Sequence, residues 1–196
     1  MAHGEFSGEP QATWLTENDA PDRRMRLLSD FSFIDPDGKE WRTPAAYVID
    51  GASIPKALWT LVGSPYTGDY RRASVVHDKA CDDAGGDTAA RRTADRMFYH
   101  ACRAGGCSVA EAILLYIGVR IGAITPHVPA WSPPDPPAGI HGPRLSRTTS
   151  ESRLEADYRL TAEHVLRQGD VDDPSEIERR TDEALTAVTG IDLRGK

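Results

Sequence analysis

The chain has 196 residues and a formal net charge of −7, with 39% hydrophobic and 27% charged residues. This composition is typical of a globular protein with one core and room for an appendage. Because binding to a nucleic-acid duplex needs a basic face, the acidic balance disfavours nucleic acid as a partner.

Cysteine usage and hydropathy indicate the compartment. Cys81, Cys102 and Cys107 include no C-x-x-C pair, which argues against a disulfide framework and against a zinc knuckle. The first ten residues lack the apolar run of a secretory signal. Charges interrupt the most apolar stretch, Val109–Ile124, and it is too short to span a bilayer. We therefore expect a cytoplasmic protein without a transmembrane segment.

A β-hairpin is predicted near the start of the chain. Residues 1–24 are polar and are expected to form a flexible arm before a core domain at residues 25–125. Met25–Asp35 and Lys39–Asp50 are both rich in β-favouring residues. The intervening Asp-Pro-Asp-Gly sequence combines a fixed proline φ with a glycine that tolerates positive φ, which is typical of a turn.

Helical periodicity follows the hairpin. A loop at Gly51–Pro55 and a short helix at Lys56–Val62 precede a helical pattern at Tyr70–Ala84. A second helix is expected to start at Asp87 or Thr88, and the capping box Ser108-x-x-Glu111 opens a third. The sequence thus predicts an α-dominant α+β fold, with the hairpin packed on a three-helix core.

The last third of the chain differs in composition. Residues 126–149 are rich in proline and are predicted to be a linker or strap. Residues 150–196 carry two further helical patterns, one capped by Asp173 with Pro174 in its first turn, and a net charge of −5 from 12 acidic and 7 basic residues. Such a helix pair has little core of its own, so we expect it to dock on the domain, on a protein partner or on a second copy.

Four polar residues are candidates for chemistry. His77 shares a helix face with apolar residues, and Asp95 lies on the following helix beside Ala94 and Phe98. Two antiparallel helices would bring His77 and Asp95 together, and a buried carboxylate can hold an imidazole in one tautomer. Asp78 points roughly 100° away from His77. Together with Asp50 and a carbonyl near Gly51, it could bind calcium, which prefers oxygen ligands.

A structural role explains the same residues. A histidine on an apolar face is more often a satisfied core residue than a catalyst, and Asp50 before Gly51 suits a turn. Asp95 is also an i,i+4 partner for Arg91. An enzyme requires an open cleft with a metal at Asp78, whereas a structural role requires a closed, fully hydrogen-bonded network.

Residues 26–122 resemble a phage-associated domain-of-unknown-function family, numbered 1353. The resemblance is carried by short motifs, which here are Asp30-Phe31, Trp41-Arg42-Thr43-Pro44, Asp50-Gly51-Ala52-Ser53-Ile54-Pro55, Trp59, Tyr70, Ala73, His77-Asp78 and Ala94-Asp95-Arg96-Met97-Phe98. This resemblance implies a fold without implying a reaction.

Prokaryotic phospholipase A2 enzymes show a similar order of motifs. Asp50-Gly51 with Ser53 and Pro55 is followed here by His77-Asp78, and then by Asp95 with Phe98-Tyr99. The resemblance implies that His77 is the general base for water, that Asp95 orients it, and that Asp78 and Asp50 bind calcium. The sequence departs from these enzymes at Asp82, where an aromatic residue would be expected, and it lacks evident disulfides.

Hydrolysis of a lipid or another ester is therefore the leading functional hypothesis. A lipid hydrolase needs an apolar collar around its cleft, and the candidates for this collar are Leu58, Trp59, Leu61 and Val62. Alternatively, these four residues simply fill the core. The competing hypothesis is a non-enzymatic phage accessory or assembly protein, and a toxin or defence effector using the same site is a third. The only histidine upstream of His77 is His3, so an HD phosphohydrolase, which needs another upstream histidine, ranks low. The motifs H-E-x-x-H, P-loop and G-x-G-x-x-G are absent from the sequence.

Overall fold

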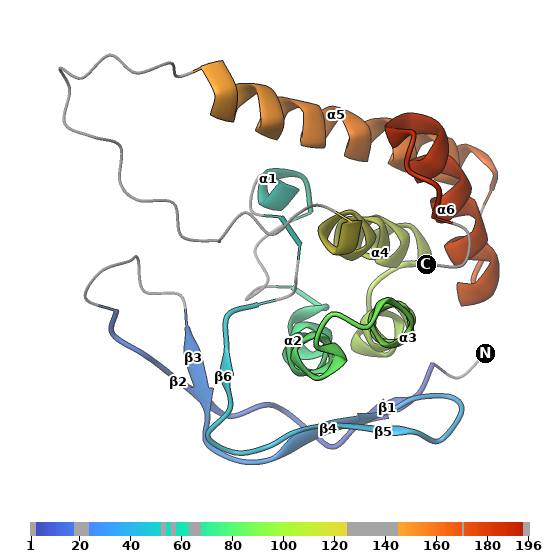
Figure 1. Cartoon of the computed structure of the whole chain (residues 1–196). Coiled ribbons are helices and arrows are strands. Elements are labelled where there is room, and N and C mark those ends of the chain that lie inside the picture. Colours follow the sequence, from blue (N-terminus) through green and yellow to red (C-terminus); the bar gives the residue numbers. More distant parts are fainter. Residues whose placement is uncertain are drawn as a thin grey trace, which may run out of the picture.

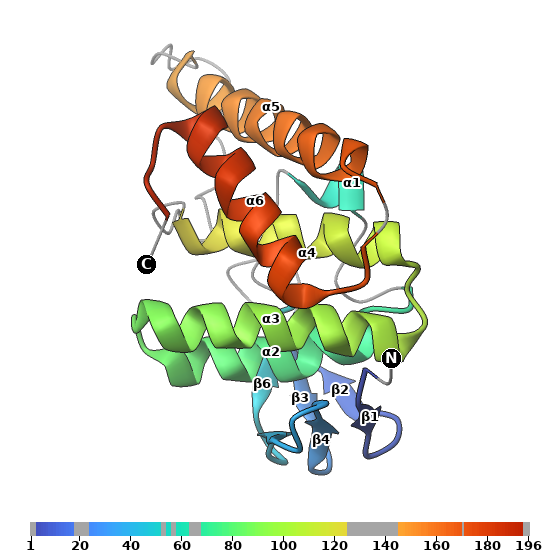
Figure 2. The same cartoon turned by 90° about the vertical axis from the view of Figure 1, so that its right-hand side faces the viewer.

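The fold is built in layers, with strands on one side and helices stacked above them. The computed structural model describes residues 3–17, 24–51, 54–55, 58–62, 68–124, 145–169 and 171–193. Figures 1 and 2 show two small sheets at one end, α2 and α3 lying against them, α4 next, and α5 and α6 on the far side. The predicted α-dominant α+β class is confirmed.

The predicted hairpin is present and continues through two sheets. β4 (Phe31–Ile34) pairs with β5 (Glu40–Thr43), and β3 (Met25–Leu27) pairs with β6 (Val48–Ile49), both antiparallel. At the turn, Asp35 accepts hydrogen bonds from the backbone N–H groups of Asp37 and Lys39. Phe31 and Phe33 alternate with more exposed neighbours, so the hairpin presents an apolar face to the helices.

The expected arm at residues 1–24 contains structure that the sequence did not indicate. β1 (Glu5–Phe6) pairs with β4, and β2 (Ala12–Trp14) pairs with β3. His3 is bound by two side chains: its Nδ1 lies 3.2 Å from Nδ1 of His100, and its Nε2 lies 3.1 Å from Asp172. These strands have two and three residues, too few for a period-2 pattern to stand out in the sequence.

The three predicted core helices are α2 (Arg71–Ala84), α3 (Thr88–Gly105) and α4 (Val109–Ile124). Asp87 caps α3 by accepting hydrogen bonds from the N–H groups of Ala89 and Ala90. A Cβ at Gly105 would lie 2.3 Å from the carbonyl oxygen of Asp69, so the end of α3 can approach the start of α2 closely only because this residue is glycine. The buried faces of α2 and α3 bring the two candidate site residues inward.

Two helices follow the proline-rich segment. They are α5 (Leu145–Arg167) and α6 (Pro174–Thr189), and α6 has the predicted Asp173 cap. α5 therefore starts inside the segment predicted to be a linker, after its last proline at position 143. The rest of the predicted linker, residues 126–144, lies outside the described residues.

The acidic extension docks on the domain itself. Tyr158 of α5 donates a hydrogen bond to the carbonyl of Leu114 in α4 at 3.1 Å. In α6, Glu178 and Asp182 bind Arg92 of α3, and Glu178 also binds Arg96 at 2.8 Å. The acidic charge of α6 thus meets a basic stripe on α3, while Ile177 and Leu185 enter the core. Among the described helices, none has the length and apolarity needed to cross a membrane.

The first test concerns this docking. Replacing Leu185, which is fully buried, with alanine should lower the free energy of unfolding by about 2–5 kcal/mol, because it leaves a cavity between α6 and the core. Urea unfolding, followed by circular dichroism, measures the change. Leu160 in α5 is 54% exposed, so Leu160→Ala is the matched control and should change stability by about 0.5 kcal/mol or less. Equal effects of the two substitutions would contradict the docking of α6.

Candidate functional site

The predicted contact between His77 and Asp95 is confirmed. Nε2 of His77 lies 2.8 Å from Oδ1 of Asp95, and both side chains are fully buried between α2 and α3. An ionised carboxylate can only accept, so Nε2 carries the proton in this bond. Asp95 therefore fixes the orientation of the ring and leaves Nδ1 as the nitrogen that can exchange a proton.

Asp95 is held by more than the histidine. Nε of Arg91 donates to the same oxygen at 3.0 Å, so the predicted i,i+4 contact is also present. Arg120 of α4 donates to the other oxygen at 3.2 Å, and its second terminal nitrogen contacts Asp182 of α6 at 3.3 Å. A buried chain of alternating charges thus connects α2, α3, α4 and α6.

This environment shifts the ionisation of both members of the pair. Burial raises the pKa of Asp95, but the hydrogen bond from His77 and the charges of His77, Arg91 and Arg120 outweigh it, so the pKa lies below its usual range. Burial lowers the pKa of His77, but interactions with Cys81 and Asp95 raise it to about 9. At neutral pH the ring therefore holds its proton and Asp95 is ionised.

The ring of His77 has two further neighbours. The ring of Phe98 lies 4.6 Å away, centroid to centroid, at an angle of 41°. Sγ of Cys81, one turn further along α2, lies 3.6 Å from Nδ1 and 3.5 Å from Nε2. Cys81 is partly exposed, whereas His77 is not. The pair therefore reaches the protein surface at Cys81 and not at His77.

Asp50 and Asp78, proposed as calcium ligands, also lie together. The backbone N–H of Asp50 donates to Oδ2 of Asp78 at 3.0 Å, which ties the loop after β6 to α2. Burial and the charge of Asp50 raise the pKa of Asp78 to about 7, against the lowering effect of the hydrogen bond from Asp50. Gly51 follows with a left-handed φ of 104°. A carboxyl group whose pKa is raised by a neighbouring negative charge is stabilised by protonation or by a bound cation.

Within the described residues, one group of three metal-ligating side chains comes together, and it is not the predicted one. It consists of His77, Cys81 and Asp95, whose ligand atoms lie within 4.8 Å of one another. The donor set of nitrogen, sulfur and oxygen suits zinc better than calcium. Calcium at Asp50 and Asp78 stays a prediction.

The candidate apolar collar is only partly available to a ligand. Leu58 is fully buried, while Trp59, Leu61 and Val62 are partly buried and pack against the core. Trp59, in α1 (Trp59–Val62), donates a hydrogen bond to the carbonyl of Ile54 at 3.1 Å. Leu58 thus acts as a core residue, as the alternative interpretation expected. Ser53 of the phospholipase-like motif lies outside the described residues.

Sequence reasoning missed three members of this site. Cys81 follows His77 by four residues, a spacing that places both on one helix face and that could have indicated this contact. Arg120 interrupts an apolar helix, which is a signal for a buried ion pair. Asp182 lies 62 residues further along the chain than Arg120, and no local pattern indicates their contact.

The candidate site lies in the part of the chain that matches a known protein family. Residues 25–119 match a family described as "Protein of unknown function (DUF1353)". His77, Asp78, Cys81 and Asp95 all fall in that region, as does the loop at Asp50. The family resemblance noted from the sequence is thereby supported, and the family's description names no reaction.

Two curated relatives come from Sinorhizobium fredii (strain NBRC 101917 / NGR234). The uncharacterized protein y4jT is 36% identical over 131 residues, which are 66% of this chain and 35% of that protein. The uncharacterized protein y4iH is 38% identical over 93 residues, or 47% of this chain and 38% of that protein. The chain thus spans little more than a third of the length of these relatives. No solved structure matches it significantly.

A second test concerns the acidic pair. The pKa of Asp78 is about 7 in the folded state, above its usual value of 3.8, so its ionisation lowers stability as the pH rises through 7. Asparagine can accept the hydrogen bond from Asp50 without ionising. Asp78→Asn should therefore raise the free energy of unfolding at pH 8 relative to wild type, by on the order of 2 kcal/mol after allowance for solvent screening, and leave it nearly unchanged at pH 4.

Urea unfolding at both pH values measures this effect. Asp83→Asn is the matched control, because Asp83 is an exposed carboxylate on the same helix whose ion pair with Lys79 contributes little. A variant Asp78→Asn that is less stable than wild type at pH 8, with calcium chelated, would contradict the repulsion between Asp50 and Asp78.

Proposed function

We propose that residues 25–125 form an ester hydrolase in which His77 moves the proton and Asp95 orients His77. The hydrogen bond of 2.8 Å from Nε2 of His77 to Asp95 is the observation that supports this most directly. It leaves Nδ1 for proton transfer and stabilises the imidazolium that forms when the ring accepts a proton.

The order of residues along α2 supports the phospholipase-like version of this proposal. Asp78 follows His77 directly and is tied to the Asp50 loop, so a cation held by the two carboxylates would lie next to the histidine. Such a cation would stabilise the negative charge that develops on an ester oxygen during attack. The substrate class is then a phospholipid or another ester whose oxygen can approach this cation.

The ionisation of His77 sets the expected pH dependence. A histidine that activates water must first be neutral, and the pKa of His77 is raised to about 9. Hydrolysis should therefore accelerate as the pH rises from 7 towards 9, rather than level off near 6.5 as it would with an unperturbed histidine.

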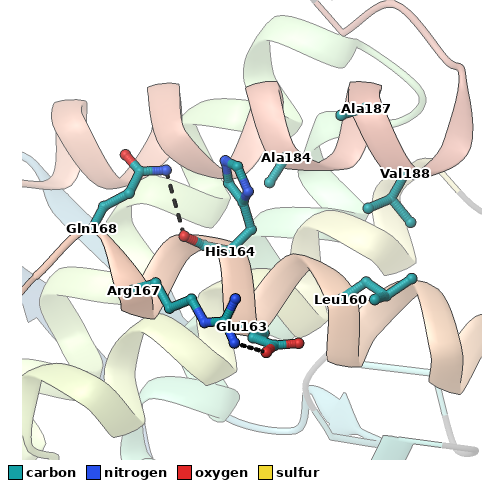
Figure 3. A pocket seen from close by; sticks show the side chains of 8 residues that line it. All are labelled: Leu160, Glu163, His164, Arg167, Gln168, Ala184, Ala187 and Val188. Carbon is teal, nitrogen blue, oxygen red and sulfur yellow. Dashed lines mark hydrogen bonds and ion pairs between the residues drawn. The ribbon is translucent and has the colours of Figure 1, made fainter.

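The second candidate function is not enzymatic. In this case the protein would be an accessory or assembly protein of a phage-type particle. The observation favouring it is the complete burial of His77 and Asp95, together with the three cationic groups that satisfy Asp95. The binding surface would then lie on the C-terminal helices. Figure 3 shows an open groove between α5 and α6, lined by Leu160, Glu163, His164, Arg167, Gln168, Ala184, Ala187 and Val188.

The third test decides between these functions. Acyl release is measured from vesicles of phosphatidylglycerol or phosphatidylcholine and from p-nitrophenyl acetate, with calcium or with a chelator. His77→Gln should reduce turnover by about 100-fold or more, the usual contribution of a general acid–base residue. Chelation and Asp78→Asn should both reduce turnover, because each removes the cation from the proposed site.

His164→Gln is the matched control, because His164 is exposed on α5, away from the dyad, and its substitution should leave turnover unchanged. Thermal unfolding of each variant shows whether the fold is retained. Absence of acyl release from every ester, or equal turnover by wild type and His77→Gln, would exclude the hydrolase and favour the assembly protein.

A further inference from the structure

Cys81 occupies the position that a nucleophile would need in this site. Its sulfur contacts both ring nitrogens of His77, at 3.6 Å and 3.5 Å, and Nε2 of the same ring is bound to Asp95 at 2.8 Å. A cysteine beside a histidine whose second nitrogen is held by a carboxylate is the arrangement that activates a thiol. Cys102 and Cys107 are fully buried and lie outside this arrangement.

We propose that Cys81 is the catalytic nucleophile of this domain, in a Cys81–His77–Asp95 triad that transfers an acyl group through a thioester on Sγ. This inference rests on the proposed ester hydrolase and changes its attacking group from water to a thiolate. Exposure supports the proposal as well as distance. His77 is inaccessible to solvent, whereas Cys81 contacts it and is partly exposed, so from this face of α2 an ester can reach the pair only at Cys81.

Hydrolysis of an ester by this triad needs no reactant other than water. Cys81 gives its proton to Nδ1 of His77, and the thiolate attacks the ester carbonyl carbon. The C–O bond of the ester breaks, and the leaving alkoxide takes the proton back from His77 to give an alcohol. Water, deprotonated by His77, then attacks the thioester, which releases a carboxylic acid and restores the thiol.

The charged groups around the ring are compatible with this role. Asp95 binds the ring from α3, Arg91 and Arg120 bind the carboxylate of Asp95, and Asp78 follows His77 on α2. The sulfur is almost equidistant from the two nitrogens, so transfer to Nδ1 requires a small rotation of the Cys81 side chain, as is common before substrate binds.

A zinc ion on the same three residues is the competing use of this cluster. Zinc would bind an oxygen of Asp95, but Arg91 donates to Oδ1 and Arg120 donates to Oδ2. A divalent cation placed next to these two guanidinium groups is repelled by both. The two guanidinium groups do not oppose a thiolate in this way, because its charge is opposite to theirs.

The fourth test detects the covalent intermediate. The protein of 196 residues is mixed with p-nitrophenyl acetate, quenched in acid, digested and analysed by mass spectrometry. An acetyl group that hydroxylamine removes is expected on Cys81, and Cys102 and Cys107 should stay unmodified as internal controls. Iodoacetamide should alkylate Cys81 about 100-fold more slowly in His77→Gln than in wild type, because the variant lacks the group that accepts the thiol proton.

Cys81→Ser separates this inference from the proposed function. If the variant keeps its fold and loses turnover at least about 100-fold while binding the ester, the thiol is the nucleophile. If Cys81→Ser retains turnover and His77→Gln does not, water is the nucleophile, so the hydrolase stands and this inference fails. Absence of acetyl-Cys81 in folded wild type, or stoichiometric zinc that blocks alkylation of Cys81, overturns the inference as well.

Discussion

The carboxylate of Asp95 is the group on which the arrangement of the helices depends. A fully buried charge is tolerated only when it is paired and hydrogen-bonded, and Asp95 receives three donors: His77 from α2, Arg91 from its own helix and Arg120 from α4. Through Arg120 the pairing continues to Asp182 in α6. Removing one partner of such a set leaves an unpaired buried charge, which costs about 3–5 kcal/mol. The helices therefore cannot shift independently without breaking a charge pair.

The same pairing limits what the site can do. Asp95 is satisfied by the two arginines even when His77 is neutral, so the ring can gain and lose a proton without leaving the carboxylate unpaired. A histidine that served packing alone would need neither this freedom nor a partly exposed thiol against its nitrogens. The ring is fully buried at rest, so proton transfer to the leaving alkoxide and from water requires Cys81 to rotate away from Nδ1 first.

The sequence predicted the parts of the fold whose signals are local. The His77–Asp95 contact followed from two helices of known phase joined by a short glycine turn, and the Asp35–Gly38 turn followed from its residues. The strands β1 and β2 were not predicted, because they have so few residues that only their partners define them. Arg120 was visible as a charge in an apolar helix, but its partners Asp95 and Asp182 lie 25 and 62 residues away, and sequence periodicity carries no information at that range.

The site divides between a chemical part and a stabilising part, and the two have different places in the chain. His77, Cys81, Asp95 and Arg91 all lie within residues 25–119, the region that matches the family. Arg120 follows that region directly, and Asp182 belongs to α6. The acidic extension thus supplies no group to the proposed proton transfer. It supplies the charge that holds Arg120 against Asp95, and through Arg92 it fixes α3 as well. The composition of the acidic extension suggests an appendage. Its helix α6 nevertheless supplies Asp182, the last charged group of the network that orients His77.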